Sequence, residues 1–268
     1  MIRLVTANIQ HALVDGRLVD LDRLGTALAA LDADVVALQE VDHGQARSDG
    51  EAQAYRLAAA LGMREHRFVP AVRGPLDPGW RRRRAPRSAE GDDGRLPAPA
   101  GYGIALLSRH PVRAWRAMRL PGLNLPGVPP LGVDEPRVAV VAAVATPDGP
   151  LTVVATHLSQ REPWKAAQLR RLRRRVRHAP RPLVLVGDLN TRGDLPARRT
   201  GWRELVHVQT YPRTRPWIRI DHVLADGPVT AASAARAVDL GVSDHRAVVV
   251  DVELGRRHDD ARHEGGAG

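Results

Sequence analysis

The stretch Leu183-Val184-Leu185-Val186-Gly187-Asp188-Leu189-Asn190 governs how the rest of the chain is interpreted. Its first four residues are apolar and rich in valine, which favours a buried strand. Gly187 then interrupts the run, and Asp188 and Asn190 follow two positions apart, so both side chains can lie on one side of the backbone where the strand ends. Asp188 can take a proton or a metal ion, and Asn190 can hold an oxygen without adding charge. A polar turn after a strand would give the same pattern.

Length and composition restrict the class of protein. The 268 residues suffice for one large domain or two small ones, and with 43% hydrophobic but only 3% aromatic residues the core must be aliphatic. The chain has no cysteine, which excludes disulfides, thiolate metal sites and cysteine nucleophiles. The sequence has no apolar run of membrane-spanning length, and it starts on a strand-like segment without a signal-peptide pattern, so we expect a cytoplasmic location.

The formal net charge of +10 and the pI of about 11.2 favour anionic partners such as nucleic acid, phospholipid headgroups or phosphorylated small molecules. Lys165 is the only lysine, so a GC-rich coding bias could also account for the arginines. A tetra-arginine run follows Trp80, and residues 170–177 form an arginine-rich helix face that is either a binding stripe or a plain solvent face. Arginine pairs well with phosphate and an indole can stack on a base, so we consider the run as substrate-binding: Arg81, Arg82, Arg83 and Arg84.

The hydrophobic pattern predicts an alternation of strands and helices. The expected strands are residues 2–7, 34–38 ending at Gln39-Glu40, 66–69, 102–107, 112–120, 137–145, 151–156, 183–186, 218–224, 229–238 and 246–254. The expected helices are residues 18–31, 51–61 and 162–178. Residues 70–100 and 121–136 are rich in Pro and Gly and are predicted as loops, the first of them mobile and Arg-rich. We therefore expect a single domain over residues 1–254 and a disordered tail over residues 255–268.

Polar side chains recur where predicted strands end or begin. Six segments carry them: Asn8, Glu40, His157, Asp188 with Asn190, Asp221, and Asp244 with His245. In open α/β folds, strand ends are where side chains from distant segments converge on a ligand. A single acidic or amide residue in such a place often only caps or turns the chain, but six segments together favour a site.

The residue types in this set suit one reaction. Glu40, Asp188 and Asp244 offer oxygen ligands for a hard cation such as Mg²⁺ or Mn²⁺, and the sequence has no His-x-x-x-His or cysteine cluster of the kind that zinc prefers. His157 and His245 can donate to phosphate oxygens or exchange protons near neutral pH, and a carboxylate such as Asp221 could hold one of them in the required tautomer. Hydrolysis of a phosphate ester needs neutralisation of charge, an oriented water molecule and stabilisation of the leaving oxygen, and these residue types can supply all three.

Seven ordered motifs resemble the endonuclease/exonuclease/phosphatase superfamily, which includes pancreatic-type deoxyribonuclease, abasic-site endonucleases, inositol-polyphosphate 5-phosphatases and bacterial sphingomyelinases. The motifs are Thr6-Ala7-Asn8-Ile9, Leu38-Gln39-Glu40, Tyr102-Gly103-Ile104-Ala105-Leu106-Leu107-Ser108-Arg109, Thr156-His157-Leu158, Gly187-Asp188-Leu189-Asn190, Ile220-Asp221-His222-Val223 and Ser243-Asp244-His245. The resemblance runs from about residue 1 to 254. It implies a four-layer α/β sandwich in which two mixed β-sheets pack face to face with helices outside.

The resemblance also implies the metal ligands. Glu40 would be the principal ligand of Mg²⁺ or Mn²⁺, with Asn8 and Asp244 close by. Thr6-Ala7-Asn8 lacks the tryptophan that often accompanies this asparagine in the family.

The roles implied for the remaining residues concern water and phosphate. Asp188 would orient or deprotonate the attacking water, and Asn190 would hold the scissile phosphate. His245 paired with Asp221, and His157 from the other side, would stabilise charge on the phosphoryl group. The expected substrate-side residues are Tyr102 and Arg137, the second in a Glu135-x-Arg137 motif that supports the site.

The sequence favours one function and leaves two alternatives. We expect a metal-dependent phosphodiesterase or nuclease that acts on nucleic acid or nucleotides, works as a monomer and has no protein partner. A phospholipid-headgroup or small-molecule phosphoesterase is the first alternative, although no export signal or apolar membrane-contacting hairpin is recognised. The second alternative is a non-catalytic basic nucleic-acid-binding module that keeps the fold.

Overall fold

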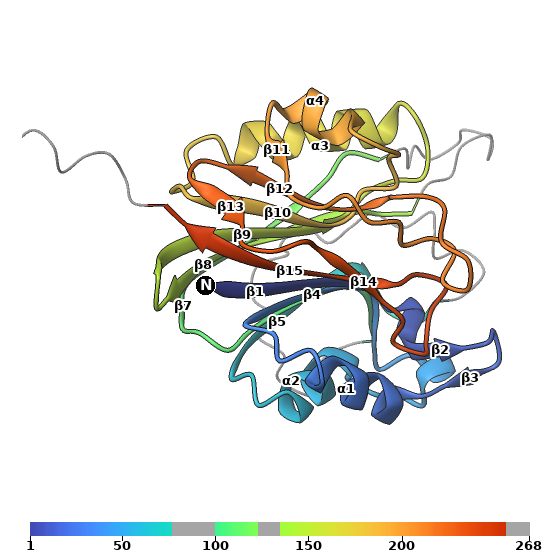
Figure 1. The fold of residues 1–268 in the computed structure, drawn as a ribbon. Helices are drawn as coiled ribbons and strands as arrows, with labels where there is room; N and C mark the ends of the chain where they lie inside the picture. Colours follow the sequence, from blue (N-terminus) through green and yellow to red (C-terminus); the bar gives the residue numbers. More distant parts are fainter. Residues whose placement is uncertain (77–99, 123–134, 256–268) are drawn as a thin grey trace, which may run out of the picture.

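A computed structural model describes residues 1–76, 100–122 and 135–255, and Figure 1 shows them as four layers. Helices α1 (Leu21–Ala29) and α2 (Gln53–Ala60) cover one sheet, and α3 (Trp164–Arg175) and α4 (Leu195–Thr200) cover the other. The two sheets lie face to face between the helical layers. The α/β sandwich expected from the sequence is therefore confirmed.

The first sheet has the strand order β13-β15-β1-β4-β6-β5, with β14 also pairing β15. Strand β1 runs parallel to β4 and antiparallel to β15, so the sheet is mixed. Its strands are β1 (Ile2–Asn8), β4 (Val35–His43), β5 (Glu65–Arg73), β6 (Gly101–Ser108), β13 (Val229–Ala231), β14 (Arg236–Val238) and β15 (Ala247–Leu254).

The second sheet has the order β11-β12-β10-β9-β8-β7. It is also mixed, because β10 pairs with β9 in parallel and with β12 in antiparallel fashion. Its strands are β7 (Val112–Arg119), β8 (Val138–Thr146), β9 (Gly149–His157), β10 (Leu183–Asp188), β11 (Arg203–Glu204) and β12 (Asp221–Asp226). The short strands β2 (Leu13–Val14) and β3 (Leu18–Val19) form a separate hairpin.

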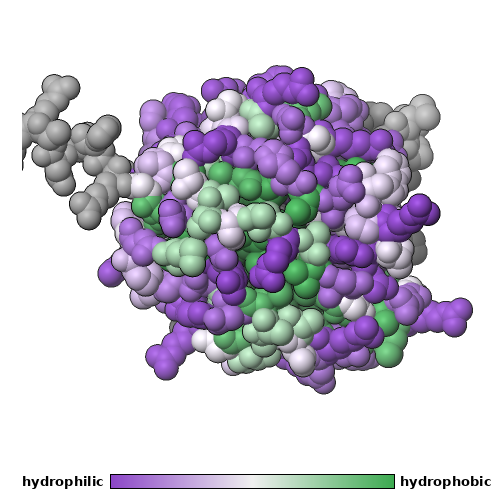
Figure 2. Space-filling view, in the orientation of Figure 1, coloured by the Kyte–Doolittle hydropathy of each residue, from purple (hydrophilic) through white to green (hydrophobic). Residues whose placement is uncertain are grey.

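Apolar side chains fill the three spaces between the four layers. One cluster, which includes Leu4, Leu106 and Val184, lies between the two sheets. A second packs α1 and α2 against the first sheet, and a third packs α3 against the second sheet. Figure 2 shows mostly hydrophilic residues over the layer of α3 and α4, and apolar residues in the band below it where strands reach the surface. Some apolar residues continue onto the layer of α1 and α2. No helix in the described ranges is long and apolar enough to cross a membrane.

Strand β10 extends through Gly187 instead of ending there, which corrects the sequence-based boundary. All six of its residues are buried, because the strand is central in its sheet and covered on both faces. Gly187 has φ 141°, and a Cβ at this position would lie 2.0 Å from the carbonyl oxygen of Thr156 on β9. Only glycine fits this close approach, and the strand therefore delivers Asp188 at its last position.

Other predicted boundaries also need correction. The helix expected from residue 18 begins at Leu21, after Asp20 accepts a hydrogen bond from the Arg23 amide as its N-cap. The strand expected over residues 229–238 is divided into β13 and β14, which pair with different ends of β15. Helix α4 and strand β11 were not predicted, because six and two residues are too short to show periodicity.

The prediction that a loop begins at residue 70 is wrong, because β5 continues to Arg73 and pairs with β6 across a bulge after Pro70. The remainder of that loop from residue 77 to 99, including Arg81 to Arg84, lies outside the described residues, as does most of the loop over residues 121–136 and the tail from residue 256.

Candidate active site

One pocket with a volume of about 530 Å³ lies beside the ends of β1 and β10, a bulge in β4 and the segment before β15. The residues that line it include six of those predicted for the site: Asn8, Glu40, Asp188, Asn190, Asp244 and His245. These residues come from segments as far apart as the first and last strands. The structure therefore brings these six residues into one pocket, with Asn8 and Asp188 at strand ends but Glu40 inside a strand. Their chemical roles stay predictions.

Glu40 reaches the pocket from a β-bulge, so β4 does not end there as predicted. The register between β4 and β6 shifts between Gln39 and Val41, and Glu40 has φ 57°. Such a left-handed conformation is costly for a residue with a side chain, and it turns Glu40 out of the regular strand alternation. Burial raises the pKa of Glu40 to about 6, although the Asn8 amide that donates to its Oε1 at 3.0 Å lowers it.

Asp188 lies almost fully buried at the end of β10. Its Oδ1 accepts the backbone N–H of Asn190 at 2.9 Å, and its Oδ2 accepts the Asn8 side-chain amide at 3.2 Å. Burial, and then the nearby carboxylate of Asp221, raise the pKa of Asp188 to about 6. At neutral pH this carboxylate is mostly ionised and still basic enough to accept a proton from water.

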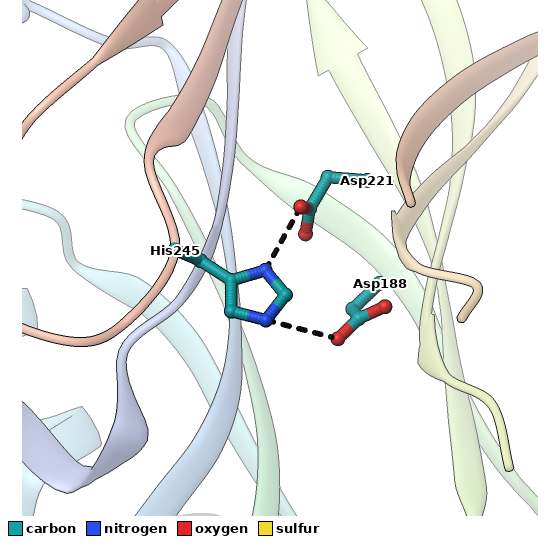
Figure 3. A group of neighbouring side chains, drawn as sticks. All are labelled: Asp188, Asp221 and His245. Carbon is teal, nitrogen blue, oxygen red and sulfur yellow. Dashed lines mark hydrogen bonds and ion pairs between the residues drawn. The ribbon is translucent and has the colours of Figure 1, made fainter. Parts of the chain in front are cut away.

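Asp221 and His245 form a buried pair opposite Asp188 (Figure 3). His245 Nδ1 lies 3.0 Å from Asp221 Oδ2, and His245 Nε2 lies 3.8 Å from Asp188 Oδ2. Thr210 also donates its hydroxyl to Asp221, on the oxygen that contacts the imidazole. Burial alone would lower the pKa of His245, but the carboxylates of Asp221 and Asp188 raise it to about 10. At neutral pH the His245 ring is therefore a cation.

His157 lies behind the pocket and does not line it. It is 3% exposed, and its Nε2 lies 3.1 Å from the Asn190 amide nitrogen and 3.4 Å from Asp188 Oδ2. Burial, followed by the charge of Arg137, lowers the pKa of His157 well below its usual value, so the ring is neutral. The Asn190 amide also donates to the Leu158 carbonyl at 2.9 Å, so both of its N–H groups are held by protein acceptors.

The predicted substrate-side residues lie elsewhere. Tyr102 on β6 and Arg137 before β8 are 6% and 5% exposed, and neither lines the pocket. Arg137 forms an ion pair with Glu135 at 3.1 Å, and its charge lowers the pKa of both Glu40 and His157. Arg137 therefore lies close enough to the site to act on it from behind, without lining the pocket. Arg81 to Arg84 lie outside the described residues.

Several residues of the pocket wall were missed from the sequence. Lys165 near the start of α3 donates its Nζ to the Asn190 carbonyl at 2.9 Å, and Arg192 and Tyr211 also line the pocket. The Tyr211 ring packs against the His245 ring with centroids 5.0 Å apart, and Arg192 stacks on the exposed Trp217. The one signal that could have identified Lys165 is its status as the only lysine in an arginine-rich chain.

Two sets of side chains in this region could ligate a cation. Asp188, Asp221 and His245 offer ligand atoms that all lie within 4.8 Å of one another. A protonated imidazole cannot ligate a metal, so the His245–Asp221 hydrogen bond disfavours this set. Glu40 and Asp244, with the Asn8 oxygen, give the hard oxygen donors that Mg²⁺ and Mn²⁺ prefer, and Glu40 shares its neighbourhood with the carboxylates of Glu135 and Asp188.

A sequence profile of the Endonuclease/Exonuclease/phosphatase family matches residues 5–245, and the chain belongs to this family. The match includes every residue of the pocket wall from Asn8 to His245. No curated protein sequence shows significant similarity to the chain.

Solved structures share the fold over nearly the whole chain. An endonuclease/exonuclease/phosphatase from Beutenbergia cavernae is 25% identical, with a TM-score of 0.69 over 95% of this chain and 72% of that one. The TDP2 protein of D. rerio, complexed with a single-strand DNA product, is 16% identical with a TM-score of 0.60, over 94% of this chain and 99% of its own. The beta toxin of Staphylococcus aureus is 14% identical, with the same TM-score and coverage.

Proposed function

We propose that the chain is a divalent-metal-dependent hydrolase of phosphate esters that works as a phosphodiesterase through in-line attack of water. The observation that carries this proposal is the pocket in which Glu40, Asp188, Asp244 and the cationic His245 face a common space. Carboxylates converging on one pocket suit a cation. A fixed imidazolium beside a basic carboxylate suits proton transfer and charge stabilisation at phosphorus.

The cation site would be formed by Glu40 and Asp244 with the Asn8 oxygen. Mg²⁺ or Mn²⁺ bound there would neutralise charge on the phosphoryl oxygens. Asn8 holds Glu40 and Asp188 in fixed relation, because its amide donates to both carboxylates.

Asp188 is the residue that we assign to the attacking water. Its Oδ1 is held by the Asn190 backbone, which leaves Oδ2 beside Asn8, His157 and His245. With a pKa of about 6, Asp188 can orient a water molecule and accept its proton near neutral pH.

His245 would stabilise charge that develops on the phosphoryl group. Asp221 and Thr210 hold its ring from behind, so Nε2 faces Asp188 and the pocket. Arg192 adds positive charge to the same wall, which favours an anionic substrate, whereas the charge of Lys165 is partly offset by Glu162 at 3.9 Å. His157 and Asn190 form a neutral hydrogen-bonded pair, and we assign them to the positioning of Asp188.

We favour a nucleic-acid or nucleotide diester as substrate. The net charge of +10 and the exposed Trp217 with its stacked Arg192 beside the pocket support a ligand that carries phosphates and planar rings. A phospholipid headgroup or a small phosphoester is the alternative, and the shared fold of TDP2 and of the beta toxin does not separate the two. Binding without turnover remains the second alternative.

A substrate panel tests the proposal. The purified chain is incubated with Mg²⁺ or Mn²⁺, with and without EDTA, and with plasmid, abasic duplex, single strands, nucleotides, sphingomyelin and phosphoinositides. We expect hydrolysis of nucleic-acid diesters that EDTA abolishes. Chelator-insensitive turnover contradicts metal dependence, preferential hydrolysis of a lipid contradicts the substrate class, and binding without hydrolysis throughout contradicts the enzymatic proposal.

A further inference from the structure

A groove lined by arginines runs along the second sheet between β7 and α3, outside the pocket described above. One hollow of about 500 Å³ is lined by Arg116 and Arg119 from β7 and by Arg171 and Arg175 from α3. A second hollow of about 440 Å³ shares Arg116 and Arg175 and adds Arg174 and Arg177. The two hollows therefore adjoin, and we refer to them together as the arginine groove.

The arginines of the groove have no acidic partners among the described residues. No aspartate or glutamate is among the described residues that line either hollow, and none of the six arginines forms an ion pair with a described carboxylate. Arginines elsewhere on the described surface are often paired, as Arg109 is with Asp32 and Arg181 with Asp226. Arginines without a described carboxylate partner also occur elsewhere, as at Arg64 and Arg236, so coding bias explains their number. It does not explain why six of them line adjoining hollows on two facing elements.

Helix stability explains only part of the cluster. Positive side chains in the last turn of a helix interact favourably with its dipole, which accounts for Arg174 and Arg175. It does not account for Arg116 and Arg119, which lie on an edge strand more than 50 positions earlier in the sequence. Like charges brought together from β7 and α3 repel each other unless an anion lies between them.

We infer that the arginine groove binds the phosphate backbone of a nucleic acid. A polyanion with regularly spaced phosphates matches an elongated hollow with cations on both walls. An anionic membrane surface suits the groove less well, because such surfaces bind faces that also insert apolar side chains. The large exposed apolar residues of the described chain, Met1, Leu18, Tyr55 and Trp217, do not line the groove.

Helix α3 links the groove to the pocket. Lys165 near its start lines the pocket, and Arg171 lies six residues later, about 9 Å along the helix axis. A strand bound in the groove would therefore extend from the neighbourhood of the pocket along α3. The inference rests on the proposed function only for this connection, because the groove can bind nucleic acid whether or not the pocket hydrolyses it.

The test is the salt dependence of binding to a labelled single-stranded oligonucleotide in EDTA, which prevents metal-dependent cleavage. The groove variant is Arg116→Gln with Arg171→Gln, and both side chains are exposed, so we expect it to fold. Arg64→Gln with Arg236→Gln is the matched control, because these arginines are also exposed and do not line the groove. Thermal melts establish that both variants are folded.

We expect the slope of log K against log salt to become shallower by about 0.7 for each phosphate that the groove variant no longer neutralises, and to change little in the control. Hydrolysis of a small chromogenic diester should be equal in all three proteins, because that substrate is too short to reach the groove.

Equal slopes in groove and control variants overturn the inference. It is also overturned if the groove variant loses binding to phosphatidylserine vesicles but keeps the wild-type slope for the oligonucleotide. Absence of diester hydrolysis in every protein would count against the proposed function alone.

Discussion

At the scale of single residues, Asp221 and His245 act as one unit. The hydrogen bond between them fixes the ring and keeps it cationic, so removing either partner removes the same charge from the pocket. We expect Asp221→Asn and His245→Gln each to lower kcat on the order of 10²-fold, and the double substitution to add little.

Steady-state kinetics on a small diester check this coupling. Asp226→Asn, at the other end of β12, is the control and should leave kcat unchanged. Additive losses in the double variant would show that the two side chains work independently.

His11 makes stability depend on pH on the acid side. Burial, and then the charge of Arg47, lower the pKa of His11 from 6.5 to about 4. Its Nδ1 is buried and has no hydrogen-bond partner in the described part of the chain. A group with a lowered pKa binds protons more readily in the unfolded chain, so its contribution to stability is present above about pH 6.5 and is lost as pH falls towards 4. We expect the free energy of unfolding to fall less at acid pH in His11→Asn, because the variant lacks the titrating imidazole. Asparagine is the replacement because it tolerates the φ of 47° at this position.

Urea unfolding of wild type and His11→Asn in EDTA, at about pH 7 and about pH 5, measures this effect. The loss of unfolding free energy between the two pH values should be smaller in the variant. An equal loss in both proteins would exclude His11 as its source.

Residue types could be predicted from the sequence, but their protonation states could not. The motifs indicated that His157 and His245 belong to the site. Their opposite pKa shifts arise from burial and from the position of Asp221, which depend on how β9, β12 and the segment before β15 come together. The same holds for the Asn190 amide, whose protein acceptors on the neighbouring strand end are visible only in three dimensions.

At the scale of elements, β10 depends on Gly187. A methyl group there would overlap the Thr156 carbonyl on β9, and the positive φ adds strain for any side chain. We expect Gly187→Ala to lower the free energy of unfolding by about 3 kcal/mol or more. Gly62→Ala is the control, because Gly62 has φ 65° but nothing within 4 Å of its would-be Cβ, and should cost about 1 kcal/mol.

Chemical denaturation of the two variants separates backbone strain from steric overlap. If the two substitutions cost the same, the close approach of β10 to β9 is not what requires glycine at position 187.

Strand β4 illustrates why a local sequence pattern predicts where a strand lies but does not predict a β-bulge within it. Its apolar run predicted a strand that ended at Glu40, because a charged residue usually marks a boundary. The strand continues to His43, and the bulge at Glu40 depends on its pairing with β6, more than 50 positions later. Sequence spacing carries no direct record of such a cross-strand register shift.

At the scale of the whole molecule, a bound cation should stabilise the fold. Glu40 and Asp244 reach the same pocket from different segments, and the carboxylate of Asp188 raises the pKa of Glu40. A cation held by Glu40 and Asp244 would offset this concentration of negative charge. We expect Mg²⁺ or Mn²⁺ to raise the melting temperature, with about 2.7 kcal/mol of stabilisation when the metal is at 100 times its Kd.

Thermal melts with and without metal test this, with Glu40→Gln as the variant and Glu51→Gln, at a half-buried carboxylate paired with Arg56, as a control for loss of charge. Glu40→Gln should lose most of the metal-induced shift, and Glu51→Gln should keep it. A wild-type shift in Glu40→Gln would remove Glu40 from the cation site.

The layered architecture could be predicted because the long strands and three of the helices carry strong hydrophobic patterns, and the ordered motifs tied them to a known fold. The arginine groove could not be predicted, because its walls come from β7 and α3 and only the packing of that helix on the second sheet brings them together. Sequence alone showed arginines on one helical face and left open whether that face binds a ligand.

The most direct measurement of the central claim is kcat for a small chromogenic phosphodiester with Mn²⁺, compared between wild type, Asp188→Asn and the surface control Asp148→Asn. Asparagine keeps the shape of Asp188 but can neither accept a proton nor attract the imidazolium of His245. We expect turnover in the wild type and the control, and a loss on the order of 10²-fold or more in Asp188→Asn. Wild-type turnover in Asp188→Asn would contradict the assignment of this pocket as the catalytic site.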